Sequence, residues 1–198
     1  MRSTAYFHED DYCQVELVCE ENLEWCLDQT RRISDFANVH AGDDMYLRPA
    51  HSVELETRGI SVDALATAVA PLQRYDAVTT GYAGIEDVIP NTSAFGASGL
   101  VLFASHPNGL VSAIWFALQP ADDESVATAI AMFSALSHWR LLLVDWPWGR
   151  VMPLTGGAVL DAYLRERRQV AEKITANMLR DRKERTTWLG RIRQWLRG

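Results

Sequence analysis

Lysine is almost missing from this chain, with only Lys173 and Lys183 among 198 residues. A lysine Schiff base would therefore have to form in the C-terminal segment. The stretch Thr155–Gly157 precedes a predicted helix, but it lacks the lysine and the spacing of a phosphate-binding P-loop. We expect Thr155 to cap that helix instead.

Long apolar runs are missing as well. The longest, residues 100–104 and 110–118, are separated by Ser105–Gly109, and neither is long enough to span a bilayer as a helix. The chain passes from its first residues into the polar stretch His8–Asp11 without an intervening apolar segment, so no signal peptide is predicted. We therefore expect a cytoplasmic protein.

Cysteine occurs only at Cys13, Cys19 and Cys26, at spacings that match no zinc-binding motif. An odd number of cysteines in a chain without an export signal predicts reduced thiols. We expect all three side chains to be buried, because free cysteine behaves as a small apolar residue.

Motifs for catalysis are also missing. Gly96–Gly99 is close to the nucleophile elbow of serine hydrolases, but the second glycine directly follows Ser98 and a strand is predicted next. No His-Glu-x-x-His motif occurs. The sequence therefore predicts no catalytic set, no metal site and no cofactor.

Charge is divided unevenly along the chain. Residues 161–198 hold eleven Lys and Arg against five Asp and Glu, a net charge of +6, whereas residues 1–160 hold eight against twenty-one, a net charge of −13. We predict an acidic body over residues 1–157, with enough hydrophobic residues for a core, and a basic helical segment over residues 158–198. The acidic body argues against nucleic-acid binding.

Hydrophobic periodicity predicts an α+β fold with a mixed, largely antiparallel sheet, packed helices and a long C-terminal helical segment. Strict alternation predicts a strand over 12–19 with one buried face, formed by Cys13, Val15, Leu17 and Cys19. Short strands are expected over 45–47 and 52–57. A longer, fully covered strand is expected over 140–146.

Turn and cap residues predict where the remaining helices and the hairpin begin and end. Asn22 and Ser61 are predicted N-caps of helices that reach Asn38 and Ala70, and a third helix opens at Asp122. Residues 100–104 and 110–118 form a predicted hairpin that turns through Pro107-Asn108-Gly109. The glycine-rich stretch 74–98 is expected to be a long irregular connection.

The basic C-terminal segment carries Trp188 and Trp195 at helical spacing. We expect it to pack on its own acidic body or on a second copy of the chain. A protein partner is the next interpretation. A membrane surface comes third, because the apolar side of the segment is short.

Residues 6–16, from Tyr6 to Glu16, resemble the start of the immunity proteins of contact-dependent and type VI secretion systems. These small bacterial proteins are encoded beside secreted toxins. The resemblance covers about a tenth of the chain and implies an acidic α+β protein that occludes a toxin without catalysis. It transfers no site residue.

An acidic, aromatic surface suits a basic cleft on such a partner, because opposite charge raises the association rate. We predict two sets of partner-binding residues. The acidic set is Glu9, Asp10, Asp11, Asp43, Asp44, Glu54 and Glu56, and the aromatic anchors are Tyr46 and Tyr82.

Two other functions are compatible with the sequence. One is a metal-dependent hydrolase with ligands from His8, Asp10, Asp43 and His51, since carboxylate and imidazole groups bind divalent metals. The other is a secretion adaptor or chaperone whose basic C-terminal segment engages cargo.

Overall fold

Seven strands form the main sheet of the computed structural model, which describes residues 3–8, 12–40, 46–82, 85–97, 99–174 and 176. The strand order is β10-β9-β2-β8-β7-β6-β3, and every neighbouring pair is antiparallel. The strands are β2 (Val15–Cys19), β3 (Gln73–Arg74), β6 (Thr92–Ala97), β7 (Leu100–Ser105), β8 (Ala113–Leu118), β9 (Leu141–Asp145) and β10 (Arg150–Pro153).

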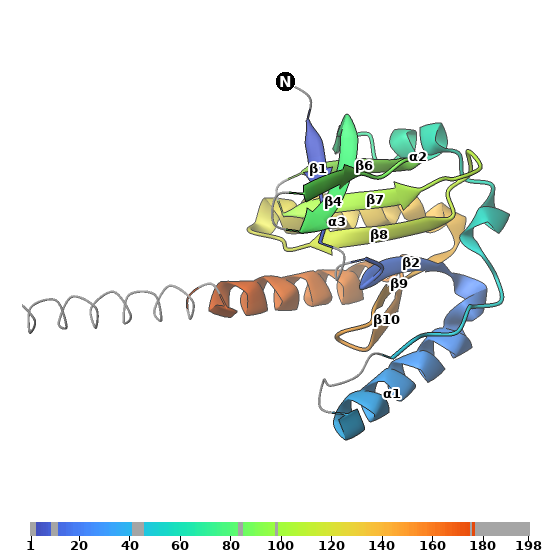
Figure 1. Cartoon of the computed structure of the whole chain (residues 1–198). Helices are drawn as coiled ribbons and strands as arrows, with labels where there is room; N and C mark the ends of the chain where they lie inside the picture. The colour runs from blue at the N-terminus through green and yellow to red at the C-terminus, as the bar shows by residue number, and fades with distance from the viewer. Residues whose placement is uncertain are drawn as a thin grey trace, which may run out of the picture.

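A smaller sheet lies across one face of the main sheet. It contains β1 (Thr4–Tyr6), β4 (Ala77–Tyr82) and β5 (Ile85–Val88); β1 runs parallel to β4, and β5 runs antiparallel to it. In Figure 1, β1 and β4 cross in front of β6, β7 and β8. The predicted α+β class with a mixed, largely antiparallel sheet is confirmed.

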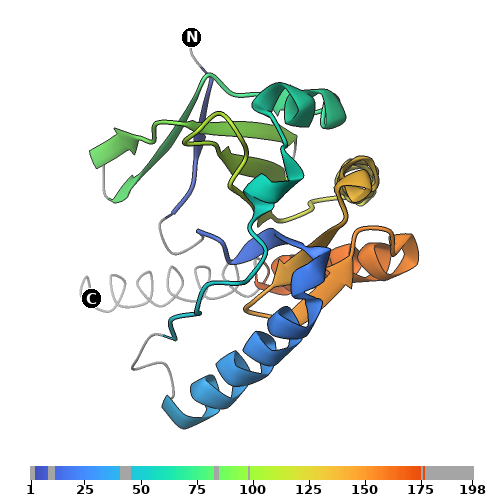
Figure 2. The ribbon, with the colours of Figure 1, turned by 90° about the vertical axis from the view of Figure 1, so that its right-hand side faces the viewer.

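Three helices cover the opposite face of the main sheet. They are α2 (Val62–Ala68), α3 (Asp123–Leu136) and a helix over residues 157–174. Leu65, Phe133 and Leu164 bring these helices into one apolar core with β2, β7, β8 and β9. Figure 2 shows α3 and the final helix on the side of the main sheet away from β1. This core is the largest in the molecule among the described residues.

The longest complete helix, α1 (Leu23–His40), packs on the same face as the small sheet but over the other end of the main sheet. Its Cys26 side chain lies against Val18 of β2 and Leu142 of β9. Of its eighteen residues only Cys26 and Gln29 are fully buried. The second half of α1 therefore extends away from the sheet, as Figures 1 and 2 show.

Local sequence signals set several helix starts as expected. The Ser61 hydroxyl accepts a hydrogen bond of 3.1 Å from the Ala64 amide at the start of α2. Asp122 and Ser125 form a reciprocal capping box at the start of α3. Asn22 acts differently from the prediction. Its buried amide bonds the backbone of Val53, and so it ties a connecting segment to the start of α1.

The expected strand over 12–19 is shorter than predicted. Residues 12–14 form a turn in which Cys13 has a left-handed φ of 52°, and the strand begins at Val15. This turn places Cys13 on the face opposite to Val15 and Leu17. The other face of the strand is also covered, because α1 packs on Val18.

Three further local predictions were wrong. Residues 52–57 form no strand, and residues 55–58 are a short 3-10 helix, η3 (Leu55–Arg58); Tyr46 and Leu47 also lie outside any strand. The stretch 74–98, expected to be irregular, supplies β4, β5 and β6. The predicted hairpin and the predicted strand over 140–146 are present as β7–β8 and β9. Among the described helices, none combines the length and the apolar character needed to cross a membrane.

Candidate functional site

The register of the main sheet places a mixed row of side chains on the face that the small sheet covers only in part. Trp115 of β8 lies between Phe103 of β7 and Glu16 of β2, and Glu16 is followed by Val144 of β9. The small sheet covers the Phe103 end of this row, and α1 covers the Val144 end. Trp115 and Glu16 therefore lie between the two covering layers.

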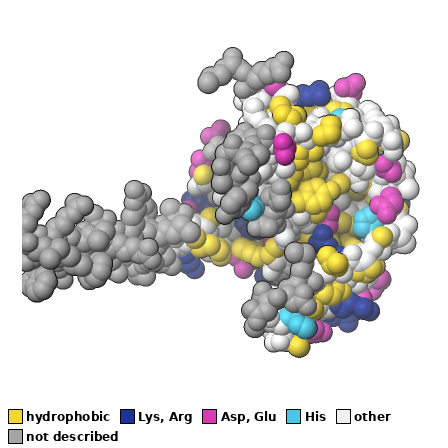
Figure 3. Space-filling view, in the orientation of Figure 1, with side chains coloured by type: hydrophobic (Ala, Val, Ile, Leu, Met, Phe, Trp, Pro, Cys, Tyr) yellow, Lys and Arg dark blue, Asp and Glu magenta, His cyan; other side chains and the backbone are white. Residues whose placement is uncertain are grey.

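An aromatic pocket opens above Trp115, with a volume of about 420 Å³. It combines aromatic and aliphatic walls with a few hydroxyl groups. The lining residues are Phe7, Tyr12, Thr80, Ile89, Pro90, Thr92, Ser105 and Trp115. On the face shown in Figure 3, hydrophobic side chains gather in the middle.

The rings of this pocket are packed against one another. Trp115 stacks on Phe103 with centroids 5.5 Å apart, and it forms T-shaped pairs with Phe7 and Tyr12 at centroid distances of 5.4 and 4.9 Å. These separations correspond to direct ring contact. The rings therefore form a fixed apolar wall, and they do not surround an empty space as the rings of a cation-binding cage do.

Tyr12 is the ring of this wall that reaches the surface, since it is 50% exposed. Partial burial, together with the neighbouring Cys13, raises the pKa of its hydroxyl to about 12. The hydroxyl therefore stays protonated at neutral pH and remains both a donor and an acceptor. An exposed aromatic residue with a polar tip on a rigid apolar wall is typical of a binding surface.

A charged group lies next to the pocket. The Trp146 indole donates a hydrogen bond of 2.6 Å to Glu16, and the Arg48 guanidinium lies 3.3 Å from the same carboxylate and 4.2 Å from the Trp146 ring. Burial raises the pKa of Glu16, although Arg48 and the Trp146 hydrogen bond act in the opposite direction. Arg48 thus fixes the segment after residue 45 against the sheet.

A second, polar cavity of about 480 Å³ adjoins the aromatic pocket through their shared residue Thr92. It is lined by Arg74, Tyr75, Asp76, Asn91, Thr92, Ser93 and His106. In it, the Ser93 hydroxyl lies 3.1 Å from Nε2 of His106. Asp76 already accepts hydrogen bonds from the amide and hydroxyl of Ser3.

The predicted partner-binding residues are not brought together in the part of the chain that the structure describes. Tyr46 lies beside α1, where its hydroxyl donates to Gln29 at 2.9 Å. Glu54 is exposed and Glu56 is half-buried, both near the start of η3. Tyr82 lies on β4 at the far end of the small sheet. The predicted acidic residues Glu9, Asp10, Asp11, Asp43 and Asp44 lie outside the described residues.

The pocket residues Phe7, Tyr12 and Trp115 were not predicted as a site. Tyr12 and Trp115 are about a hundred positions apart in sequence. The only sequence signal for this site was that the alternation over 12–19 places Tyr12 on the face opposite to the predicted buried face. No sequence pattern indicated that this side faces β8.

The proposed metal ligands are only partly described. The His51 ring forms a T-shaped pair with Trp25, and its Nδ1 lies 3.8 Å from Glu54, whereas Asp10 and Asp43 lie outside the described residues. Within the described ranges, no group of three or more His, Cys, Asp and Glu side chains is placed to hold a metal ion.

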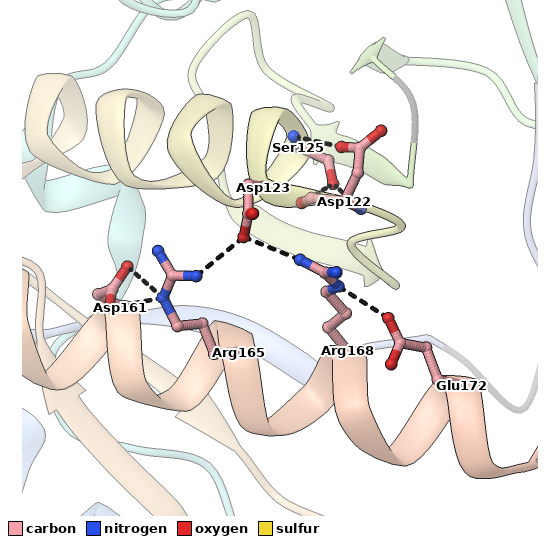
Figure 4. A network of polar contacts seen from close by, with 7 residues as sticks. All are labelled: Asp122, Asp123, Ser125, Asp161, Arg165, Arg168 and Glu172. Atoms are coloured by element: carbon pink, nitrogen blue, oxygen red, sulfur yellow. Dashed lines mark hydrogen bonds and ion pairs between the residues drawn. The ribbon is translucent and has the colours of Figure 1, made fainter.

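The first part of the basic C-terminal segment lies on the body. Arg165 and Arg168 both contact one oxygen of Asp123 at 2.8 Å, at the start of α3, as Figure 4 shows. Arg165 also pairs with Asp161, and Arg168 with Glu172, along the final helix. Residues 177–198, with Trp188 and Trp195, lie outside the described residues.

No protein-family model, no curated protein and no solved structure matches this chain significantly. The function is therefore inferred from the chemistry of the surface itself.

Proposed function

We propose that this chain is a non-catalytic binding protein that recognises another protein through the aromatic pocket. The observation that carries the proposal is the wall formed by Phe7, Tyr12 and Trp115, with Tyr12 half exposed at its edge. Tyrosine and tryptophan dominate the energetic centres of protein interfaces because they bury a large area at low entropic cost. The packed rings make this wall rigid before any partner binds.

The partner class follows from the charge and from the resemblance of residues 6–16 to immunity proteins. The acidic body would attract a basic partner and raise the association rate. We propose a cognate secreted toxin as the partner and occlusion of its active cleft as the action, in the cytoplasm of a bacterial cell. Glu54 and Glu56, together with Glu9, Asp10, Asp11, Asp43 and Asp44, are the acidic residues that we propose to attract this partner.

The experiment begins with capture of binding proteins from bacterial lysate and secreted fractions by the tagged full-length chain. Tyr12→Ala is then compared with Tyr6→Ala as a matched control. The two tyrosines are equally exposed, at 50% and 49%, but Tyr6 lies outside the pocket and its hydroxyl bonds the Gly81 carbonyl. We expect Tyr12→Ala to weaken binding of the captured partner by about 30-fold, as loss of an aromatic anchor does.

Tyr6→Ala should leave the affinity within about twofold of the wild-type value. Equal affinity of the Tyr12→Ala variant and the wild type would overturn the proposed role of the pocket. Charge reversal by Glu54→Lys and Glu56→Lys is expected to lower the association rate and its dependence on salt. Unchanged rates would contradict the acidic steering.

A second candidate function, hydrolysis by a serine nucleophile, has one observation in its favour. Ser93 and His106 are paired at 3.1 Å within a cavity, as a nucleophile and its general base are. Binding is favoured over this candidate because Ser93 is only 7% exposed, and because the His106 ring makes its one hydrogen bond to a described residue with Ser93 itself. No described carboxylate orients the imidazole.

The two functions are separated by a fluorophosphonate probe, which labels activated serines covalently. Labelling of the wild type that is lost in both Ser93→Ala and His106→Ala would establish the hydrolase. We expect no labelling at Ser93.

A further inference from the structure

An apolar groove of about 330 Å³ lies between α2, with the turn that follows it, and α3. Its floor contains Val69, Leu72 and Met132, which are buried and belong to the main core. Its sides include Ala127 and Ala131, which are exposed on α3. An apolar hollow that opens to solvent between two helices is typical of a surface that a further apolar element covers.

The only charged residue that lines this groove is acidic. Glu124, in the first turn of α3, is exposed and makes no ion pair with a described residue. The neighbouring Asp123 is already paired with Arg165 and Arg168 of the final helix. No lysine or arginine lines the groove. An apolar occupant with basic flanks therefore matches it in charge.

The final helix leads the chain to the Glu124 end of the groove. In Figure 2, α3 lies between α2 and the final helix. In Figure 4, Asp161 lies alongside α3, whereas Glu172 lies beyond the first turn of α3. The final helix therefore runs past the start of α3. A segment that continues from it has only the first turn of α3 to cross before it enters the groove.

Residues 177–198, which lie outside the described residues, have the composition that the groove requires. Trp188, Ile192 and Trp195 recur at the spacing of one face of a helix. The segment holds seven Lys and Arg against two Asp and Glu, a net charge of +5. It therefore combines an apolar face with basic flanks.

The length of this segment also suits a return into the groove. Trp188 follows residue 176, the last that the structure describes, by twelve positions, and an extended chain of that length spans up to about 40 Å. A helix is about 10 Å across, so the chain reaches over the first turn of α3. On a helix, Trp188 and Trp195 lie about 11 Å apart, close to the distance of about 12 Å between Ala127 and Ala135 on α3.

We infer that the groove between α2 and α3 is the docking surface for the chain's own C-terminal segment. The two tryptophans of the segment cover the alanines of α3, and its basic residues lie beside Glu124. Attachment through the final helix makes the docking intramolecular, which favours it over docking of the same segment from a second copy. The aromatic pocket stays free, because it lies on the opposite face of the main sheet.

The first test is methyl NMR of the full-length protein labelled at alanine. An indole ring above a methyl group displaces the methyl signal, so Trp188→Leu and Trp195→Leu should move the signals of Ala127 and Ala131. Ala64 is the internal control, since it is exposed on α2 but does not line the groove, and its signal should not move. Unmoved signals at Ala127 and Ala131 in both variants would overturn the inference.

The second test changes the groove instead of the segment. Ala131→Arg fills the groove and repels the basic segment, whereas Ser134→Arg adds the same charge at an exposed position of α3 outside the groove. Amide hydrogen exchange over residues 188–196 should be at least about tenfold faster in Ala131→Arg than in the wild type, since the burial of an aromatic side chain is lost.

Ser134→Arg should leave that exchange unchanged. Equal exchange in the wild type and both variants would contradict the docking. Thermal unfolding verifies that both variants fold, and the alanine signals of the tryptophan variants test the docking even if Ala131→Arg does not fold.

Dilution separates the chain's own segment from other occupants. We expect the alanine signals and the exchange over residues 188–196 to be independent of protein concentration. Protection that is lost on dilution would assign the segment to the groove of a second copy, and would overturn intramolecular docking. Signals at Ala127 and Ala131 that respond only to a captured partner would assign the groove to that partner instead.

Discussion

The hydroxyl of Tyr163 donates a hydrogen bond of 2.7 Å to the carboxylate of Asp145, which has no exposed surface. Arg167 lies 3.3 Å from the same carboxylate, and the Trp148 amide donates to its other oxygen at 3.1 Å. Burial raises the pKa of Tyr163, so its hydroxyl remains a donor. These contacts fix the final helix to the end of β9.

Removing Arg167, which pairs with the buried Asp145, is expected to lower the free energy of unfolding far more than removing an exposed charge from the same helix. Arg167→Ala leaves Asp145 buried with no paired charge, which should lower the free energy of unfolding by about 3–5 kcal/mol. Tyr163→Phe removes one donor and should cost about 1–3 kcal/mol. Urea denaturation measures both.

Arg165→Ala is the control, because its partners Asp161 and Asp123 are exposed to solvent. Arg165→Ala should lower the free energy of unfolding by less than about 1 kcal/mol. Equal costs for Arg165→Ala and Arg167→Ala would show that the Asp145 group does not hold the helix.

Glu16 is expected to make stability depend on pH. Burial raises its pKa in the folded state, so between the unfolded and the folded pKa values the unfolded chain binds fewer protons. The contribution of Glu16 to stability should therefore be fully present below the ordinary pKa of glutamate and be lost as the pH rises through the raised value. Glu16→Gln should flatten that part of the pH profile of the unfolding free energy.

Glu20→Gln is the matched control for this change, because Glu20 follows β2 directly but is exposed and pairs with Arg140. Its profile should follow that of the wild type. A Glu16→Gln profile as steep as the wild-type profile would rule out Glu16 as the source of the dependence.

The three cysteines are expected to resist thiol reagents in the folded protein. All three are buried and free, and burial raises the pKa of each thiol, that of Cys26 to about 12. Because the thiolate is the reacting form, DTNB at pH 8 should modify almost none of them. After unfolding in guanidinium, three thiols per chain should react. Rapid modification of the native protein would show that one of them is accessible.

Two left-handed glycines provide a matched test of backbone packing. Gly99 has a φ of +70°, and a Cβ added there would collide with the Gln119 carbonyl; Gly109 has a φ of +79° and open space around it. Gly109→Ala should lower the free energy of unfolding by about 1–2 kcal/mol, because alanine is strained in the left-handed backbone conformation. Gly99→Ala should cost more, since the Gln119 backbone must also move. Denaturation midpoints in urea measure the difference, and equal losses would contradict the collision.

Elements with strong local signals were predictable from the sequence. The Asp122 and Ser61 caps form their hydrogen bonds within three residues, and the Pro107–Gly109 turn joins its two strands locally. The apolar strand β9 was recognisable because it is buried on both faces. In each case the energy that fixes the element comes from neighbouring residues or from its own composition.

The stretch 74–98 was not predictable in this way. Its strands contain glycine and alanine, which are depleted in strands, and they are stabilised by pairing with β1, β3 and β7. Asn22 shows the same limit at a single residue. Its type predicted a hydrogen bond at the helix start, but the partner Val53 is about thirty positions away.

The sequence by itself determined the α+β class, the antiparallel hairpin, the helix starts at Ser61 and Asp122 and the division of charge, because periodicity, turn chemistry and composition act over short distances. Only the tertiary structure decided which side chains meet. The left-handed turn at Cys13 moves Tyr12 next to Trp115, and the strand register places Glu16 beside the same ring. The aromatic pocket exists because these long-range pairings bring together residues that no local pattern connects.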